Sequence, residues 1–292
     1  MHKRLRCLRR SGVVKFAGSQ ARAIGAEIRK YRDSLGWTLE KLAEATDISR
    51  STLSRIETGV RKAGVDEVAS ILTALSVTGS PKDRLINLAG AASGAWVGIG
   101  SGIAQQLSAI SAYEAEAQGI YEFQVSVLPG LLQTAEYARV LISTSPLGSA
   151  ERERAVFTRV GRQAVLTRPG LRRYSAFIDE AALRRRASGD PKMMATQLSH
   201  LITVGEGASK SVRVIPFSVG AYWGCEGAFT LYELGEDHNV VYQENQGSGV
   251  FIDDQSASVY KSVLENLDNV ALDPSESRQL ISTYLEQYEN EV

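Results

Sequence analysis

The sequence is poor in the residues that build disulfide frameworks and metal sites. Its 292 residues include two cysteines, Cys7 and Cys225, and three histidines. Two cysteines are too few for a framework of several bridges, and His2, His200 and His238 show no metal-ligand spacing. These shortages exclude a disulfide-stapled scaffold and a zinc site. We therefore expect no metal and no cofactor.

Long apolar runs are absent as well. No stretch approaches the roughly 18 apolar residues that a bilayer-spanning helix needs. The basic N-terminal segment MHKRLRCLRRSG lacks the apolar core of a signal peptide. With 43% hydrophobic and 23% charged residues, the composition is that of an ordinary globular protein. We expect a cytoplasmic protein of two domains that makes no contact with a membrane.

The net charge of zero hides a segregation of the two signs. Residues 1–62 hold 15 Lys and Arg against 6 Asp and Glu, whereas the remaining 230 residues hold 18 against 27. A basic head on an acidic body suits a protein that binds a polyanion through one end. The alternative is that the charges only solvate the two surfaces.

The most informative stretch is WTLEKLAEATDISRSTLSRIETG, residues 37–59. Thr38 opens a short helical pattern, Asp47 lies at a tight corner, and Ser49 stands where the N-cap of a second helix belongs. This second helix, residues 50–58, has an apolar edge, and its other face carries arginines and small hydroxyl side chains. Such a face fits the major groove of DNA, although an ordinary αα-hairpin on the surface is the alternative.

Residues 21–90 resemble the Xre (lambda-repressor-like) family of helix-turn-helix domains, most closely along SRSTLSRIETG from Ser49 to Gly59. The resemblance implies binding to double-stranded DNA, and hence a nucleoid location. By resemblance, the side chains that face bases are Arg50, Ser51, Ser54 and Arg55. Those that face phosphates are Thr38, Thr52, Arg61 and Lys62. Arg32 and Glu57 match a pair that ties the first helix to the end of the recognition helix.

Two positions depart from the family pattern. Leu39 stands where the family often has a glutamine that contacts DNA, so the resemblance does not carry that contact over to this sequence. Asp47 replaces the usual glycine of the turn, at a left-handed position that aspartate occupies at modest cost.

Periodicity and turn residues predict the domain boundaries. We expect a basic, disordered arm over residues 1–18 and a five-helix domain over residues 19–92. A small-residue, flexible linker follows over residues 93–102. Its GIGSG sequence resembles a nucleotide-binding loop only superficially, because no strand precedes it and no lysine follows it.

Residues 103–292 are predicted to form an α+β domain. Helical spacing first covers 103–123, and short β-branched and aromatic runs then alternate with further helices. The expected strands are 173–178, 212–216, 228–233 and 240–244, and the other expected helices are 133–142, 150–166, 180–185, 192–205, 255–267 and 274–290.

The second domain resembles the module that follows the Xre domain in many actinobacterial regulators, including WhiJ-like proteins. The matching sequence segments are LPGLLQTAEYA (128–138), FIDEAALRR (177–185), VRVIPFSVGA (212–221), FTLYEL (229–234) and VVYQEN (240–245). That group is described as antitoxin-like and is often encoded beside a small partner protein. The resemblance implies a transcription regulator whose second domain receives a signal, through a nearby-encoded small protein or by another route.

Three further expectations concern the second domain. Its carboxylates, such as Asp179 and Glu180, match helix caps as well as acid–base pairs, and no nucleophile elbow or phosphate loop is present, so we expect no enzyme. One interpretation is that four side chains of this domain line a ligand pocket. The alternative is that they pack between the hairpin and the helices. The four are Tyr222, Trp223, Tyr242 and Glu244. A protein–protein adaptor is a further alternative.

A single Xre domain buries little surface on DNA, so tight binding requires more than one copy. We therefore expect a homodimer that reads an inverted repeat with half-sites about one helical turn apart.

Overall fold

The computed structural model describes residues 18–90, 95–98, 103–235, 238–245 and 248–292. Contacts divide the chain into two compact units, residues 1–93 and 94–292, and each is described by itself. The predicted arm lies outside the described residues except for its last residue, Gly18.

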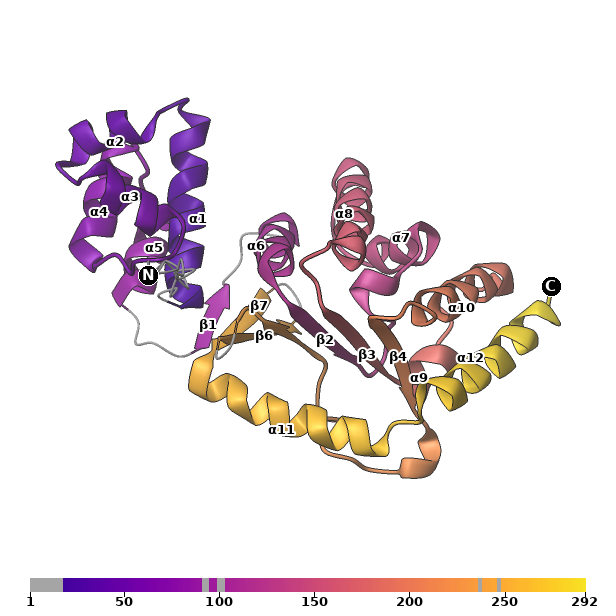
Figure 1. The fold of residues 1–292 in the computed structure, drawn as a ribbon. Helices are drawn as coiled ribbons and strands as arrows, with labels where there is room; N and C mark the ends of the chain where they lie inside the picture. The colour runs from indigo at the N-terminus through magenta and orange to yellow at the C-terminus, as the bar shows by residue number, and fades with distance from the viewer. Residues whose placement is uncertain (1–17, 91–94, 99–102, 236–237, 246–247) are drawn as a thin grey trace, which may run out of the picture. The chain divides into compact units, whose positions relative to one another are not determined.

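The described part of the N-terminal unit is a bundle of five helices around one apolar core (Figure 1). The helices are α1 (Ser19–Ser34), α2 (Leu39–Thr46), α3 (Arg50–Glu57), α4 (Val65–Ala74) and α5 (Ser80–Gly90). Every helix contributes to the core, which includes Ile24, Ile28, Leu42, Leu53, Ile56, Val68, Ile71, Leu72 and Leu85. The predicted all-α head is confirmed.

Local chemistry explains where these helices begin. The Ser49 Oγ accepts the Thr52 N–H at 3.2 Å and caps α3. Asp47 lies in the left-handed region with φ 56°, as the turn between α2 and α3 requires. Helix α4 begins after Gly64 and not at the nearby Asp66, the residue type that usually caps a helix. The Gly64 N–H is instead bound by the Glu67 carboxylate at 2.9 Å.

Helix α1 packs closely against the end of α3. A Cβ at Gly25 would lie 2.1 Å from the Ile56 carbonyl oxygen, and one at Gly59, where φ is +71°, would lie 2.4 Å from Cγ of Arg22. Only glycine fits these two positions without a shift of the backbone. Helix α3 is therefore held at a fixed angle by α1.

The C-terminal unit is built on a mixed sheet whose seven described strands have the order β1-β7-β6-β5-β2-β3-β4. The strands are β1 (Ala95–Gly98), β2 (Gly119–Gln124), β3 (Arg173–Asp179), β4 (Lys210–Ile215), β5 (Phe229–Glu233), β6 (Asn239–Asn245) and β7 (Ser248–Asp253). Strands β2, β3 and β4 are parallel, and all other pairs are antiparallel. Helical crossovers connect the parallel strands, as that geometry demands.

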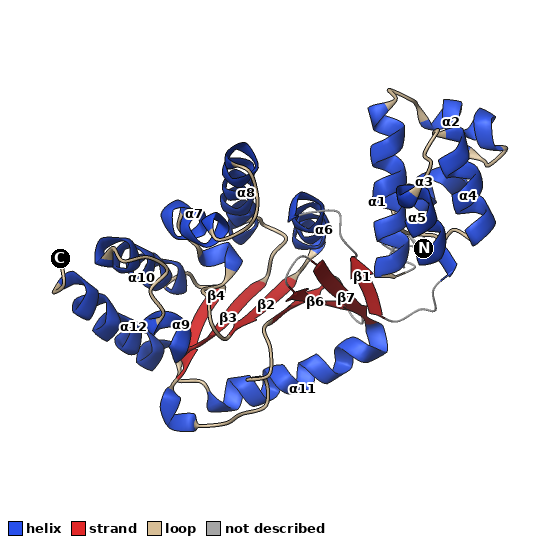
Figure 2. Ribbon diagram, turned by 180° about the vertical axis from the view of Figure 1, so that it is seen from behind, coloured by secondary structure: helices blue, strands red, loops and turns tan. Residues whose placement is uncertain are grey.

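Helices cover both faces of this sheet (Figures 1 and 2). They are α6 (Ile103–Glu116), α7 (Ala135–Ser143), α8 (Ser149–Gly161), α9 (Glu180–Arg184), α10 (Pro191–Gly205), α11 (Asp254–Val270) and α12 (Pro274–Glu289). One face carries α6, α7, α8, α10 and α12 and buries the larger core. The opposite face carries α11 and buries a second core around Phe123, Phe229 and Leu267. The predicted α+β class is confirmed.

The helix predicted over 103–123 ends early, at Glu116. Residues 119–124 form β2 instead, in the interior of the sheet between β3 and β5. Ile120 and Phe123 continue the helical spacing of α6, which misled the sequence prediction. In the structure they lie on opposite faces, one in each core. Pairing on both edges outweighs local helical periodicity here.

The predicted flexible linker, residues 93–102, contains a strand. Residues 95–98 form β1, which pairs antiparallel with β7. The sequence prediction weighed the glycines of this stretch and missed the short Ala-Trp-Val-Gly strand, because its partner β7 is more than 150 residues away. Residues 93–94 and 99–102 lie outside the described part of the chain.

Among the described residues, no helix is both long and apolar enough to cross a membrane.

Candidate functional sites

The outer face of α3 displays the side chains that the sequence assigned to base contacts. Arg50, Ser51 and Arg55 are exposed and Ser54 is half-buried. On the opposite side, Leu53 and Ile56 are fully buried in the core. The fold thus separates a packing face from a polar face along one short helix. No part of the N-terminal unit that the structure describes buries these arginines.

The two arginines differ in their surroundings. Arg50 forms an ion pair with Glu40 of α2, and the two side chains are 67% and 58% exposed. A backbone hydrogen bond at Glu40 lowers the pKa of its carboxyl, and Arg50 adds to this effect. Arg55 has no ion-pair or side-chain hydrogen-bond partner among the described residues. Both guanidinium groups are accessible to a ligand, but Arg50 must first leave Glu40.

The residues assigned to phosphate contacts lie at the starts of two helices and in the loop that follows α3. Thr38 caps α2 and accepts the Lys41 N–H at 3.3 Å, and Thr52 lies in the first turn of α3. Exposed N–H groups and the helix dipole make such helix starts favourable for phosphate. Lys62 is exposed. Arg61 is half-buried and binds Glu67 through two contacts of 3.0 and 2.9 Å.

The structure also contains the Arg32–Glu57 pair. The Arg32 Nε and Nη2 donate to the two carboxylate oxygens of Glu57 at 2.6 and 2.9 Å, and Nη1 donates to the Trp37 carbonyl at 2.7 Å. Both side chains are largely buried. The hydrogen bonding that Arg32 donates to the Glu57 carboxylate raises the pKa of Arg32. This pair holds α1 against the end of α3 and positions the exposed face.

The aromatic pocket predicted in the C-terminal unit does not form, because the sheet separates its members. Tyr222 packs on the α11 face and donates to Asp179 Oδ2 at 2.6 Å. Tyr242 is buried in the core on the opposite face, and Glu244 follows it by two residues along β6. Trp223 is 52% exposed. The alternative interpretation, packing, holds for Tyr222 and Tyr242.

The adjacent carboxylates Asp179 and Glu180 are engaged in structural contacts. Asp179 caps α9 through the Ala181 N–H at 2.8 Å. Glu180 accepts the Phe217 N–H at 2.7 Å and the Tyr284 hydroxyl at 2.5 Å. These bonds join the ends of the parallel strands to α12. No group of His, Cys, Asp or Glu suited to a metal ion occurs in the described parts of the chain.

Sequence reasoning missed a buried polar cluster on the helix-rich face of the sheet. Arg162, at the end of α8, binds Glu114 of α6 through contacts of 2.6 and 3.0 Å. Glu122 of β2 accepts the Tyr174 hydroxyl at 2.5 Å. Burial raises the pKa of Glu122 to about 7, against the opposing effects of Tyr174 and Arg162. A carboxylate within the apolar run Gly-Ile-Tyr-Glu-Phe is the sequence signal for this cluster.

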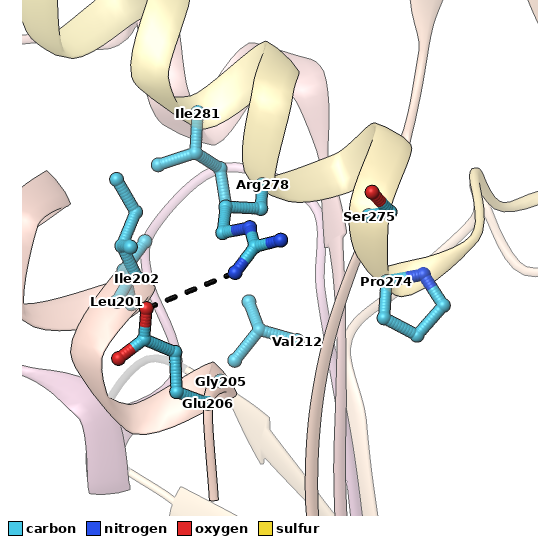
Figure 3. Close-up of a pocket in the computed structure, with 9 residues that line it drawn as sticks. All are labelled: Leu201, Ile202, Gly205, Glu206, Val212, Pro274, Ser275, Arg278 and Ile281. Atoms are coloured by element: carbon cyan, nitrogen blue, oxygen red, sulfur yellow. Dashed lines mark ion pairs between the residues drawn. The ribbon is translucent and has the colours of Figure 1, made fainter.

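The C-terminal unit also has a shallow pocket of about 250 Å³ between α10, α12 and β4 (Figure 3). Its walls are mainly apolar, and Arg278 and Glu206 face each other across it at 3.7 Å. Both side chains of this pair are more than half exposed. An exposed pair of this kind is worth little energy and gives the pocket little selectivity.

Comparison with known proteins assigns one family to each of the two units. Residues 28–80 match a helix-turn-helix family, the kind of domain that DNA-binding regulators use. No curated protein is significantly similar to the chain. Residues 107–283, more than half of the sequence, match the family described as a domain of unknown function, DUF5753. The chain therefore belongs to the DUF5753 family and carries a helix-turn-helix domain in front of that family's domain.

Proposed function

We propose that the protein is a sequence-specific transcription regulator whose helix α3 enters the major groove of DNA. One observation carries the proposal. The helix-turn-helix displays exposed arginine and hydroxyl side chains on α3 while its opposite side is anchored in the core. The first 62 residues also carry the excess of positive charge. A basic, exposed and rigidly held helix matches the groove in shape and charge.

The proposed contacts divide into two classes. Arg50, Ser51, Ser54 and Arg55 read base edges, since they lie on the outward face of α3. The phosphate contacts come from the helix ends and the loop that follows α3: Thr38, Thr52, Arg61 and Lys62. Phosphate contacts fix the position of the domain on the duplex, whereas base contacts supply the sequence preference.

We further propose that the protein binds as a homodimer to an inverted repeat, because one such domain buries too little surface for tight binding. The C-terminal unit then receives the signal, from a small protein encoded nearby as in the antitoxin-like, WhiJ-like regulators it resembles. A small molecule is the second candidate for the signal, and the buried polar cluster favours it. The proposal includes no catalytic step.

Selection of bound duplexes from a random DNA library tests this function. The expected result is one enriched motif with two-fold symmetry, and sedimentation of the complex should give two chains per duplex. An enriched motif without symmetry, bound by one chain, would contradict the proposal that the protein binds as a homodimer. A library that shows no enrichment at all would contradict sequence-specific binding.

A further inference from the structure

Helix α8 presents a large aromatic side chain to solvent. Phe157 is 81% exposed, more than any other large apolar residue that the structure describes. The preceding residues Ala155 and Val156 are buried on the inner side of the helix, where they pack with Ile142 of α7 (Figure 1). Phe157 takes no part in that cluster and makes no ring contact within the described residues. Apolar surface of this size gains free energy when a partner removes it from water.

Phe157 belongs to a stripe of exposed residues along the outer side of α8. These residues follow one another at spacings of four, three and four positions, and they are Ala150, Arg154, Phe157 and Gly161. Alternation of three and four is the spacing at which a helix presents one seam to a second helix. The inner side of α8 already has its partners in the fold, whereas this outer stripe has none among the described residues of its own unit.

Gly161 leaves a gap in the stripe one turn beyond the phenylalanine. Its φ of −59° and ψ of −29° are helical, so the backbone conformation does not require glycine. A Cβ added at Gly161 would meet no atom within 4 Å. Glycine is unfavourable in a helix, and neither a positive φ nor a close neighbour in its own unit explains it here. Its place is explained if the backbone of another helix approaches it closely.

Arg154 places a positive charge in the same stripe, one turn before Phe157. It is exposed and has no ion-pair or side-chain hydrogen-bond partner in the described part of the chain. A guanidinium group is attracted to the face of an aromatic ring. The stripe therefore contains both members of a cation–π pair, and the described residues of this unit supply neither with a partner.

We propose that α8 pairs with the α8 of a second copy of this chain. In an antiparallel pair with its two-fold axis between Arg154 and Phe157, Phe157 of each copy lies opposite Arg154 of the other. Gly161 of each copy then lies opposite Ala150, so small residues meet at both ends of the seam. The symmetry makes every contact twice. A parallel pair would instead place Arg154 against Arg154, and the two like charges would repel each other.

The length of α8 limits the strength of this contact. Its 13 residues span about 20 Å, which is short for a standard protein–protein interface. The free dimer is therefore in exchange with monomer. Two half-sites on one duplex hold two copies close together and raise their effective concentration. The use of this contact on DNA rests on the regulator function proposed above, whereas the contact itself forms without DNA.

Sedimentation equilibrium of the full chain over a range of concentrations, without DNA, tests this contact. The wild type should show a reversible equilibrium between monomer and dimer. Phe157→Ser should raise the Kd of the dimer by about tenfold or more, because it removes the central aromatic contact from both copies. Gly161→Gln should raise the Kd as well, because it fills the space at the seam. The matched control is Val259→Ser, which removes a 53% exposed apolar side chain from α11 and should leave the Kd unchanged.

Thermal unfolding at a concentration where the wild type is monomeric shows whether the variants fold. Phe157→Ser removes no packing contact of the core, and Gly161→Gln replaces a weak helix former, so neither should lower the midpoint. A wild type that stays monomeric at every concentration would overturn the proposal. So would dimers of unchanged Kd in Phe157→Ser and Gly161→Gln, which would place the dimer contact on another surface, or an equal rise of the Kd in Val259→Ser.

The two proposals fail in distinguishable ways. A protein that dimerises through α8 but enriches no motif from the DNA library would contradict the regulator function alone. A protein that enriches a motif but stays monomeric without DNA would contradict the α8 contact alone.

Discussion

Arg32 of α1 and Glu57 of α3 are joined by two hydrogen bonds of 2.6 and 2.9 Å, and only 11% and 2% of their side chains are exposed. The pair links residues 25 positions apart in the sequence. It stands behind the recognition helix, on the side away from its polar face. The orientation of that face therefore depends on a contact that does not touch DNA in our proposal.

Glu57→Ala should destabilise the N-terminal unit by about 3 kcal/mol, because it leaves a buried arginine without its carboxylate. This value is the low end of the usual cost of removing one partner of a buried ion pair, because Arg32 keeps the Trp37 carbonyl and Asp33 as partners. Hydrogen exchange of the α1 and α3 amides measures the loss. Asp33→Asn is the control, because Asp33 is 58% exposed and its pair should contribute less than about 1 kcal/mol. Equal protection in Glu57→Ala and wild type would contradict a stabilising role.

Arg55→Ala should lower binding to the selected DNA site by about 1–3 kcal/mol and relax the preference at one base position. The reason is that Arg55 is exposed on α3 and unpaired in the described residues, so its donors are available to a base. Competition between the selected duplex and single-base variants measures this preference. If Arg55→Ala keeps the selectivity of the wild type, Arg55 does not read bases.

Lys62→Ala should instead weaken binding to all sequences alike and reduce the salt slope, d log K/d log [salt], by about 0.9. An exposed lysine beyond the end of α3 contributes charge to the backbone contact and carries no base preference. The measurement is affinity for the selected duplex and for a scrambled one at four salt concentrations. A change of selectivity without a change of slope would assign Lys62 to the bases.

Glu40→Gln should raise affinity for DNA severalfold. Glu40 pairs with Arg50 in the free protein, so Arg50 gives up that contact before it reaches a base. Glu44→Gln is the matched control, because Glu44 is exposed on the same helix and its replacement removes the same charge. A gain of equal size in both variants would show a general charge effect rather than competition for Arg50.

Glu122→Gln should flatten the pH dependence of stability in the C-terminal unit. The folded pKa is about 7 against an ordinary value of 4.5, so the folded state binds the extra proton between these values. In the wild type, stability falls as pH rises through this window, by roughly 3 kcal/mol in total, and stays lower above it. Some slope should persist in the variant, because burial also raises the pKa of Glu114.

Denaturant unfolding at pH 5 and pH 8 measures this difference. The advantage of Glu122→Gln over the wild type should be larger at pH 8, where the wild-type carboxylate is buried and charged. The same advantage at both pH values would show that Glu122 does not titrate between them.

Local chemistry made the N-terminal unit predictable from the sequence. The cap at Ser49, the left-handed Asp47 and the apolar spacing of α1 each determine a piece of structure within a few residues. The Arg32–Glu57 pair followed from the family resemblance, since the two positions are too far apart to be linked by periodicity. For these reasons the candidate DNA face can be assigned from the sequence and the family resemblance alone.

The C-terminal unit was less predictable because its sheet joins distant segments. Strand β2 looks helical by spacing, and only pairing with β3 and β5 makes it a strand. Tyr222 and Tyr242 both looked suited to one pocket, yet the sheet lies between them. Arg159 reads as one more surface arginine of α8, and only the fold brings its Nη1 to Gln133 Oε1 at 3.2 Å.

Fluorescence anisotropy of the selected duplex, compared with a scrambled duplex of equal length, tests the central claim most directly. Wild type and the double variant Arg50→Ala/Arg55→Ala are titrated at low and at moderate salt. We predict that the wild type prefers the selected duplex and that the double variant binds both duplexes equally, with weaker but still salt-dependent affinity. Wild-type protein that fails to bind either duplex at low salt, or a double variant with undiminished preference, would contradict the account.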